Sequence, residues 1–218
     1  MKSVLEGIIS SKLVAIARNV PTDLIAATAK AIHAGGFGIM EITFNQASPT
    51  GLSDTATSIA LVREAMGPAM LVGAGTVITK EQVHTARDAG AQFCLAPNTD
   101  IAIIKEILDA GMLAIPGALT PTEIVAAYQA GASIVKLFPA GNFGLSYVKA
   151  IRGPINHIPL MAVGGIDETN VAQFLDNGFC SAGIGSNVVK NSLIKERNFV
   201  ELTNVARKFS DAIKGCKE

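Results

Sequence analysis

The sequence has no tryptophan, two tyrosines and three histidines in 218 residues. It also lacks an excess of either charge, because 18 lysines and arginines balance 18 aspartates and glutamates. Proteins that bind nucleic acids generally offer a basic surface to the phosphate backbone and aromatic side chains to the bases. The composition therefore argues against nucleic acid as a partner.

Cysteine is equally scarce in this chain. Cys94, Cys180 and Cys216 are odd in number and lie far apart, so they predict neither a disulfide framework nor a zinc pair at short spacing. The histidines do not pair at metal-ligand spacing either. We expect a protein without a metal ion, in a reducing cytoplasm.

Long apolar runs are missing too. No run approaches the roughly 18 residues that cross a bilayer. Glu6 falls where a signal peptide needs its apolar stretch. We therefore expect no membrane association.

The sequence is instead rich in apolar residues, since 49% of its residues are hydrophobic and only 17% are charged. A chain of this length and composition can bury one large core. No linker, repeat or low-complexity tract divides it. We predict a single domain over residues 1–218.

Eight short apolar segments alternate with longer amphipathic ones. Each is rich in Val, Ile, Leu or Ala and ends at Gly, Pro or a polar residue, as the strands of a buried parallel sheet do. The predicted strands are residues 13–17, 38–43, 70–73, 92–96, 113–116, 133–138, 160–163 and 181–184.

The segments between the predicted strands carry helix signals at both ends. Thr120, Pro121 and Glu123 form a capping box with proline at the first helical position, and Thr79 and Asp167 are further candidate helix starts. Glycine is the residue most common just beyond a helix. It is expected to end helices at Gly35, Gly90, Gly111, Gly131 and Gly178.

Eight strands, each followed by a helix, predict a (β/α)₈ TIM barrel, with an extra N-terminal helix at residues 4–10. An open, doubly wound sheet is the alternative, and such a sheet usually carries a glycine-rich nucleotide loop. The two candidate loops, residues 73–76 and 183–186, lack the third small residue of that motif, because Ile78 and Val188 stand in its place.

Lys136 interrupts an otherwise apolar predicted strand. Side chains alternate along a strand, so Ile134, Lys136 and Phe138 share one face. Burial lowers the pKa of the amine and makes the neutral, nucleophilic form accessible, which can condense with a carbonyl to a Schiff base. The alternative is a structural lysine neutralised by a carboxylate.

Glu41 shares a face with Ile39 and Thr43 in the second predicted strand. A buried carboxylate must pair with another group or be retained for proton transfer. A Schiff-base enzyme needs such a group to move protons at the carbons beside the imine. The alternative is a plain ion pair between Glu41 and Lys136.

Glycine-rich loops follow the last two predicted strands. Gly164 and Gly165 come after the seventh strand, and Gly185 and Ser186 after the eighth. In TIM barrels these two loops commonly bind phosphate through backbone N–H groups. Arg18 closes the first strand at the same end, where it can reach an acidic substrate. The pattern predicts a site for a small phosphorylated anion.

Together, short motifs along nearly the whole chain resemble the class I 2-keto-3-deoxy-6-phosphogluconate (KDPG) / 4-hydroxy-2-oxoglutarate (KHG) aldolase family. Their order and joint presence are specific, although no single motif is. The motifs are residues 16–18, 41–44, 72–77, 96–98, 115–117, 135–139, 163–166 and 185–186.

This resemblance implies that Lys136 is the Schiff-base lysine and Glu41 the acid/base residue. It implies a phosphate loop at Gly164, Gly165, Gly185 and Ser186. It also implies a homotrimer that uses no metal and no organic cofactor, and whose ligands are pyruvate and a phosphorylated 2-keto-3-deoxy sugar acid. The implied pocket for the 2-oxo acid comprises Arg18, Thr43, Asn45, Thr76, Pro97, Phe138 and Val163.

Two of these positions depart from the gluconate-type pattern. Some members carry an arginine that contacts the substrate carboxylate where this chain has Asn45, and many carry threonine where it has Val163. Both changes resemble the sister 2-keto-3-deoxy-6-phosphogalactonate aldolases.

The resemblance leads us to expect cleavage of 2-dehydro-3-deoxy-6-phosphogluconate to pyruvate and glyceraldehyde 3-phosphate, with 4-hydroxy-2-oxoglutarate as a further substrate. The galactonate epimer is the alternative substrate within the family. A cofactor-free phosphate-ester isomerase or epimerase and a non-catalytic phosphate-binding barrel are the alternatives from other classes.

Overall fold

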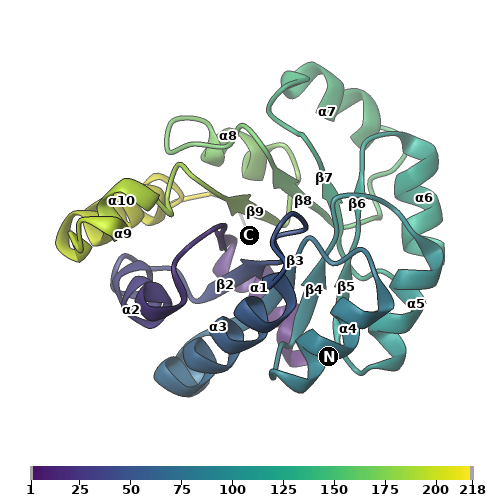
Figure 1. Cartoon of the computed structure of the whole chain (residues 1–218). Coiled ribbons are helices and arrows are strands. Elements are labelled where there is room, and N and C mark those ends of the chain that lie inside the picture. The colour runs from purple at the N-terminus through teal and green to yellow at the C-terminus, as the bar shows by residue number, and fades with distance from the viewer. Residues whose placement is uncertain (1, 217–218) are drawn as a thin grey trace.

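A parallel sheet of nine strands forms the centre of the molecule, and helices surround it (Figure 1). The structure, a computed structural model, describes residues 2–216. The strands are β1 (Leu13–Ala17), β2 (Ile39–Thr43), β3 (Leu71–Gly75), β4 (Phe93–Leu95), β5 (Leu113–Ile115), β6 (Gly117–Ala118), β7 (Val135–Leu137), β8 (Leu160–Val163) and β9 (Ser181–Ile184).

The sheet curls into a barrel whose ends meet at Pro116. The strand order is β5-β4-β3-β2-β1-β9-β8-β7-β6, so the two ends of the sheet are consecutive in the chain. The sequence predicts that the fifth strand ends at Pro116, but the structure continues it beyond this residue as β6, and Pro116, which has no N–H to donate, interrupts it. Its carbonyl still accepts the Lys136 N–H at 2.9 Å, which ties this point to β7. The predicted TIM barrel is confirmed, with β5 and β6 together as its fifth strand.

Ten α-helices lie in the described part of the chain, and most follow a strand and pack on the outside of the barrel (Figure 1). Short 3₁₀ turns, Thr22–Leu24 and Gly67–Ala69, precede α2 and β3. The helices are α1 (Lys2–Ser11), α2 (Ile25–Ala34), α3 (Gly51–Met66), α4 (Lys80–Asp88), α5 (Ile101–Asp109), α6 (Pro121–Gln129), α7 (Gly144–Arg152), α8 (Val171–Asp176), α9 (Asn191–Lys195) and α10 (Phe199–Ala212).

The helix starts follow the sequence signals with one exception. Thr79 and Thr120 are N-caps, each in a full capping box. The start predicted at Asp167 is wrong, because α8 begins four residues later, at Val171. The Asp167 side chain instead accepts the N–H groups of Thr169 and Asn170, a local turn that competes with helix.

Left-handed glycines end four of the five helices at the positions expected. Gly90, Gly111, Gly131 and Gly178 have φ between 79° and 106°. At the end of α2 the left-handed residue is Gly36 rather than Gly35. Each of these stops allows the chain to turn back at once into the next strand.

Alternate strand residues build two separate apolar layers. One set packs between the strands and the outer helices, and the other fills the barrel itself. Val4 and Ile8 of α1 belong to the interior set, and Gly7 of the same helix lies against Leu71, the first residue of β3. The extra N-terminal helix therefore closes the amino end of the barrel and leaves the carboxyl end open.

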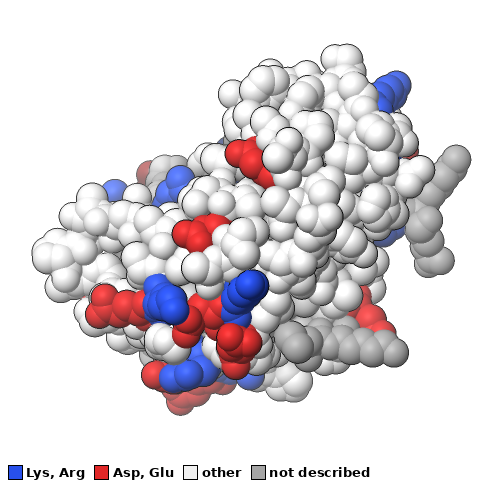
Figure 2. All heavy atoms as spheres, turned by 90° about the vertical axis from the view of Figure 1, so that its right-hand side faces the viewer, with Lys and Arg blue, Asp and Glu red and all other residues white. Residues whose placement is uncertain are grey.

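The outer surface carries charges of both signs. On the face over α4 and α5, basic and acidic side chains intermingle, and the ion pairs Lys80–Glu106 and Arg87–Asp88 lie on these two helices (Figure 2). Much of the rest of that face is uncharged (Figure 2). No helix within residues 2–216 is both long and apolar enough to cross a membrane.

Candidate active site

Lys136 lies in β7, and its side chain enters the barrel. Its strand neighbours are Gly117 of β6 and Met161 of β8. Only 5% of Lys136 is exposed, and its Nζ lies 4.8 Å from the centre of the Phe138 ring. Ile134, two residues earlier, belongs to the barrel interior, which settles that the face shared by these three residues is the inner one.

The environment of Lys136 favours the neutral amine. Burial lowers the pKa of Lys136, and the positive charge of Arg18 lowers it further, while the charge of Glu41 opposes both effects. Desolvation is the largest of the three. A lysine with a lowered pKa presents the free amine that carbonyl addition requires.

Glu41 lies in β2 and is 1% exposed. Burial raises the pKa of its carboxyl group, opposed by the charges of Lys136 and Arg18. Its Oε2 has no hydrogen-bond partner, and within residues 2–216 no ion pair joins Glu41 to Lys136. The alternative of a plain Glu41–Lys136 ion pair is therefore not what the structure contains. A buried, unpaired carboxyl oxygen is costly and is available to exchange a proton.

Gly75 makes room for the Glu41 side chain. A Cβ at position 75 would lie 1.6 Å from Glu41 Oε1 and 2.4 Å from its carboxyl carbon. Gly73 plays the same part for the Phe93 ring. In the sequence these glycines count as an incomplete nucleotide loop and as part of the family motif at residues 72–77, and neither interpretation predicts this role. Two glycines on alternate positions of a buried strand are a signal that large side chains from neighbouring strands cross over it.

A cleft of about 280 Å³ opens at the carboxyl ends of β1, β8 and β9. Phe138 lines it and links it to Lys136. Sequence-predicted residues that line the cleft are Arg18, Phe138, Val163, Gly164, Gly165, Gly185 and Ser186.

Backbone N–H groups are free at this cleft. Gly164 and Gly165 have φ of 88° and 71°, and the Gly164 carbonyl turns away to accept the Gly141 N–H at 2.8 Å. Across residues 2–216, no protein acceptor takes the N–H of Gly164, Gly165 or Ser186. A concave group of unpaired N–H donors is a typical anion site.

Three further predicted residues stand at the ends of other strands and do not line this cleft. Thr43 is buried at the end of β2, where its hydroxyl donates to the Ala17 carbonyl at 3.3 Å. Pro97 follows β4, and its carbonyl crowds the position of Gly117, which only glycine tolerates. Thr76 is left-handed, with φ of 57°, which a β-branched residue rarely adopts.

Two glutamines that we did not single out in the sequence hold Thr76 in place. Gln46 donates to the Thr76 carbonyl at 2.9 Å, and Gln82 donates to Gln46 at 2.8 Å. The Gln82 side chain also accepts the N–H groups of Ile78 and Thr79 at the start of α4. Glutamine is common enough on surfaces that the sequence gives no signal for this role.

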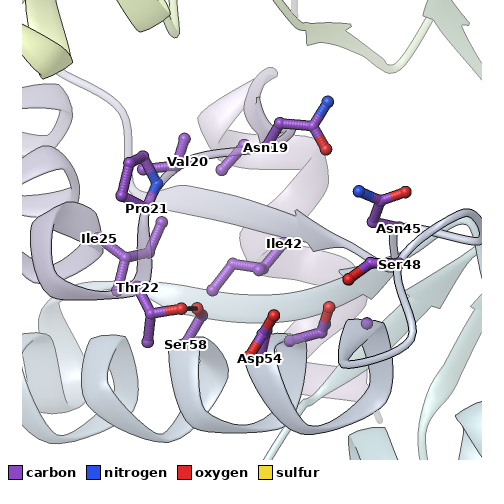
Figure 3. A pocket seen from close by; sticks show the side chains of 13 residues that line it. Asn19, Val20, Pro21, Thr22, Ile25, Ile42, Asn45, Ser48, Asp54 and Ser58 are labelled. Atoms are coloured by element: carbon purple, nitrogen blue, oxygen red, sulfur yellow. Dashed lines mark hydrogen bonds between the residues drawn. The ribbon is translucent and has the colours of Figure 1, made fainter.

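Asn45 lies elsewhere. It lines a second cavity of about 360 Å³ between the loop after β1 and the start of α3, and its side chain accepts the Ala47 N–H at 3.1 Å. Figure 3 shows Asn19 and Asn45 on one side of this cavity and Asp54 and Ser58 on the other. Asn19 lines both cavities, so the two are neighbours. The structure does not bring Asn45 into the cleft beside Lys136.

Two asparagines that our sequence reasoning missed also line the cleft. Asn187 donates to the Ile166 carbonyl at 2.8 Å, and Asn191 to the Arg18 carbonyl at 3.1 Å. Both follow β9, so only the closure of the barrel brings Asn191 to β1. No group of three or more His, Cys, Asp or Glu side chains within residues 2–216 is arranged to hold a metal ion.

Fold and site together define a TIM-barrel protein with a ligand cleft at the carboxyl ends of its strands. A family model described as "KDPG and KHG aldolase" matches residues 4–205. The chain belongs to the KDPG and KHG aldolase family, which is a family of lyases.

Known members of the family are similar over almost the whole chain. The 2-dehydro-3-deoxy-6-phosphogalactonate aldolase of Escherichia coli is 34% identical over 92% of this chain and 96% of its own. The 2-dehydro-3-deoxy-phosphogluconate aldolase of Haemophilus influenzae is 32% identical over 98% of each. The KDPG aldolase of Legionella pneumophila, solved with pyruvate as a covalent carbinolamine, is 27% identical over 95% of this chain and 98% of its own, with a TM-score of 0.81.

Proposed function

We propose that this protein is a class I aldolase that cleaves 2-keto-3-deoxy-6-phospho sugar acids to pyruvate and glyceraldehyde 3-phosphate, with Lys136 as the Schiff-base residue. The observation that carries the proposal is a buried lysine of lowered pKa, inside the barrel and beside a buried glutamate with which it forms no ion pair. The carbinolamine formed by pyruvate in the Legionella pneumophila relative supports the same chemistry for this family member.

The reaction begins with addition of the neutral Lys136 amine to the C2 carbonyl of the substrate. The carbinolamine takes up a proton from solvent, loses water and becomes a protonated imine, which accepts the electron pair of the C3–C4 bond. The Lys136 side chain is packed against the Phe138 ring, so little reorganisation is needed for the attack.

Glu41 moves the protons. Its carboxylate takes the proton of the C4 hydroxyl as the C3–C4 bond breaks and the bonding pair passes to the imine, which becomes an enamine. Glyceraldehyde 3-phosphate leaves, and the protonated Glu41 returns the proton to C3. Water then hydrolyses the imine, which releases pyruvate and regenerates the free amine of Lys136.

The glycine loops after β8 and β9 position the substrate. The N–H groups of Gly164, Gly165 and Ser186 are free to bind the phosphate, and Arg18 adds a positive charge at the mouth. In this proposal Thr43, Thr76 and Pro97, at the carboxyl ends of β2, β3 and β4, surround the 2-oxo acid from the other side of the barrel. Fixing both ends of the substrate places C2 at the amine and C4 at the carboxylate.

Borohydride reduction in the presence of pyruvate tests the proposal directly. We expect a stable adduct with the mass of a reduced pyruvate imine, mapped to Lys136 by peptide mass spectrometry and absent without pyruvate. Lys136→Met and Lys136→Arg should form no adduct and lose roughly 10³-fold or more of the aldolase activity. Turnover by Lys136→Arg without an adduct would instead indicate an isomerase or epimerase. Binding without turnover of any phospho sugar acid would indicate a binding barrel.

Among the epimers, we propose that the galactonate acid is the preferred substrate. Asn45 and Val163 both match the galactonate-type pattern, and the Escherichia coli relative of that name is 34% identical. The gluconate acid, our first expectation from the sequence, is the second candidate, supported by the Haemophilus influenzae relative. The gluconate and galactonate acids release the same products, so product analysis cannot tell them apart. Cleavage rates with each acid, and with 4-hydroxy-2-oxoglutarate, establish the order of substrate preference.

Val163 is the residue through which we expect this preference to act. It is buried at the end of β8, lines the cleft, and lies over Gly183. Val163→Thr adds a hydroxyl without a change of shape and should shift the galactonate/gluconate ratio of kcat/KM toward gluconate by about 10-fold. An unchanged ratio would remove Val163 from the account of specificity.

Assembly as a homotrimer is part of the same proposal and rests on the family resemblance. Light scattering coupled to size-exclusion chromatography measures it. A mass three times that of one chain is expected, and a monomer or dimer would contradict it.

A further inference from the structure

Only two buried side-chain oxygens or nitrogens within residues 2–216 have no hydrogen-bond partner. One is Glu41 Oε2, which the proposed mechanism uses, and the other is Asn191 Oδ1. A buried polar atom without a partner is costly, and native proteins rarely contain one without a reason. Asn191 lines the same cleft as Arg18 and Ser186.

The orientation of the Asn191 amide is determined by its neighbour. Its Nδ2 donates to the Arg18 carbonyl at 3.1 Å. A carbonyl oxygen can only accept, so the amide nitrogen must face Arg18 and the amide oxygen must face away from it. Oδ1 itself is buried, so it meets a group in the cleft only after the amide turns, and the terminal torsion of asparagine is soft enough to allow this.

An amide oxygen accepts hydrogen bonds and needs a donor opposite it. The carboxylate, the C2 carbonyl and the phosphate of a 2-keto-3-deoxy-6-phospho sugar acid are acceptors. Its donors are the C4 hydroxyl, which the mechanism assigns to Glu41, and the C5 hydroxyl. The C5 hydroxyl lies between the bond that breaks and the phosphate.

We infer that Asn191 is a specificity residue whose Oδ1 accepts a hydrogen bond from the C5 hydroxyl of the substrate, while its Nδ2 anchors the Arg18 backbone. This inference rests on the proposed aldolase function and adds to it a residue that reads the aldehyde half of the substrate. The same hydroxyl is the C2 hydroxyl of glyceraldehyde 3-phosphate in the reverse reaction.

Aldol addition of pyruvate to two aldehydes tests the inference. D-Glyceraldehyde 3-phosphate carries the hydroxyl, and 3-oxopropyl phosphate lacks it and is otherwise the same. In Asn191→Ala, kcat/KM for glyceraldehyde 3-phosphate should fall about 3- to 10-fold more than kcat/KM for 3-oxopropyl phosphate, the range expected for one uncharged hydrogen bond. Asn191→Ser, which keeps a small polar side chain at this position, should give the same selective loss if the alanine variant is unstable.

Asn187→Ala is the matched control. Asn187 lines the same cleft and anchors the Ile166 carbonyl through its own Nδ2, but it has no buried, unpartnered oxygen. This variant should lower the rates with both aldehydes by the same factor, because it disturbs only the loop.

The outcomes separate the two levels of the proposal. Equal loss with both aldehydes in the Asn191 variants, or a selective loss in Asn187→Ala as large as in Asn191→Ala, would overturn the role of Asn191. No addition by the unmodified enzyme to either aldehyde would instead refute the aldolase function.

Discussion

At the scale of single residues, the proposed chemistry depends on two buried side chains whose pKa values are shifted from their ordinary values. Burial acts on Lys136 and Glu41 in opposite directions, since it lowers the pKa of the amine and raises that of the carboxyl group. Arg18 assists the neutral amine and restrains the carboxyl shift. Both pKa values move in the direction of neutral pH, as the proposed nucleophile and proton carrier require.

This arrangement predicts the pH dependence of the reaction. Cleavage needs a free Lys136 amine and an ionised Glu41, so kcat/KM should fall as the pH decreases, and one acid-side midpoint should lie above the ordinary value of 4.5 for glutamate. Glu41→Gln should remove that midpoint and lower kcat about 10²- to 10⁴-fold, while pyruvate is still trapped on Lys136 by borohydride. Initial rates from pH 4 to 9 measure both effects. A variant with the unmodified profile would exclude Glu41 as the proton carrier.

The residue types were readable from the sequence, but their partners were not. A lysine and a glutamate within apolar strands point to a buried pair, and the structure agrees. That they avoid an ion pair, and that Asn191 reaches the Arg18 carbonyl, depends on side-chain rotamers set by contacts across strands. Asn45 shows the limit of motif reasoning, because its position next to the Glu41 motif does not bring it into the cleft that Arg18 and Phe138 line.

At the scale of elements, the strands around β3 decide where Glu41 can lie. Beyond Leu71, Gly73 and Gly75 leave the inner surface of β3 without side chains, and Phe93 and Glu41 from the two neighbouring strands fill that space. Because β3 has little packing of its own there, the carboxyl group that we propose as the proton carrier has a fixed pocket.

Gly75→Ala should therefore damage activity far more than a typical glycine substitution. The new methyl group would lie 1.6 Å from Glu41 Oε1, so the carboxylate must move. We expect kcat to fall at least about 10²-fold as a result. Overpacking should also lower the free energy of unfolding by about 1–3 kcal/mol. Gly153→Ala, whose methyl group meets only ordinary contacts at 3.7 Å, is the control and should leave activity intact. Steady-state kinetics and urea unfolding measure both. Full activity in Gly75→Ala would mean that Glu41 has another position available.

Most strand and helix positions followed from local signals, since the pattern of apolar runs, capping boxes and glycine stops is local. The departures at Pro116 and Asp167 have local physical reasons as well. Pro116 cannot donate to a ladder and splits the fifth strand, and Asp167 caps its own turn rather than a helix.

At the scale of the whole molecule, α1 closes the amino end of the barrel, and the ligand cleft opens at the carboxyl end. The side chains of α1 that face the barrel interior, Val4 and Ile8, pack at the amino end of the strands. Lys136 and the cleft lie at the carboxyl end. The packing of α1 and the proposed catalytic site thus lie at different ends of one barrel.

This separation predicts that the packing of α1 at the amino end of the barrel can be weakened without a loss of activity. Ile8 is 0% exposed, so Ile8→Ala should lower the free energy of unfolding by about 2–5 kcal/mol. Below the unfolding transition, kcat and KM should stay within about twofold of the unmodified enzyme. Urea unfolding and steady-state rates at 25 °C test this. Ile9→Ala, on the exposed side of the same helix, is the control for α1 itself. A large loss of kcat in Ile8→Ala at full folding would show that α1 acts on the site.

The sequence by itself determined the barrel class and the family and predicted Lys136 and Glu41 as the catalytic pair, because strand periodicity, glycine stops and an isolated lysine in an apolar strand are properties of neighbouring residues. Only the tertiary structure decided which face of β7 is inner, that Glu41 stays unpaired over Gly75, and that Asn191 meets Arg18 across 173 residues. Those facts arise where the barrel closes and distant strands come together, so no local pattern encodes them.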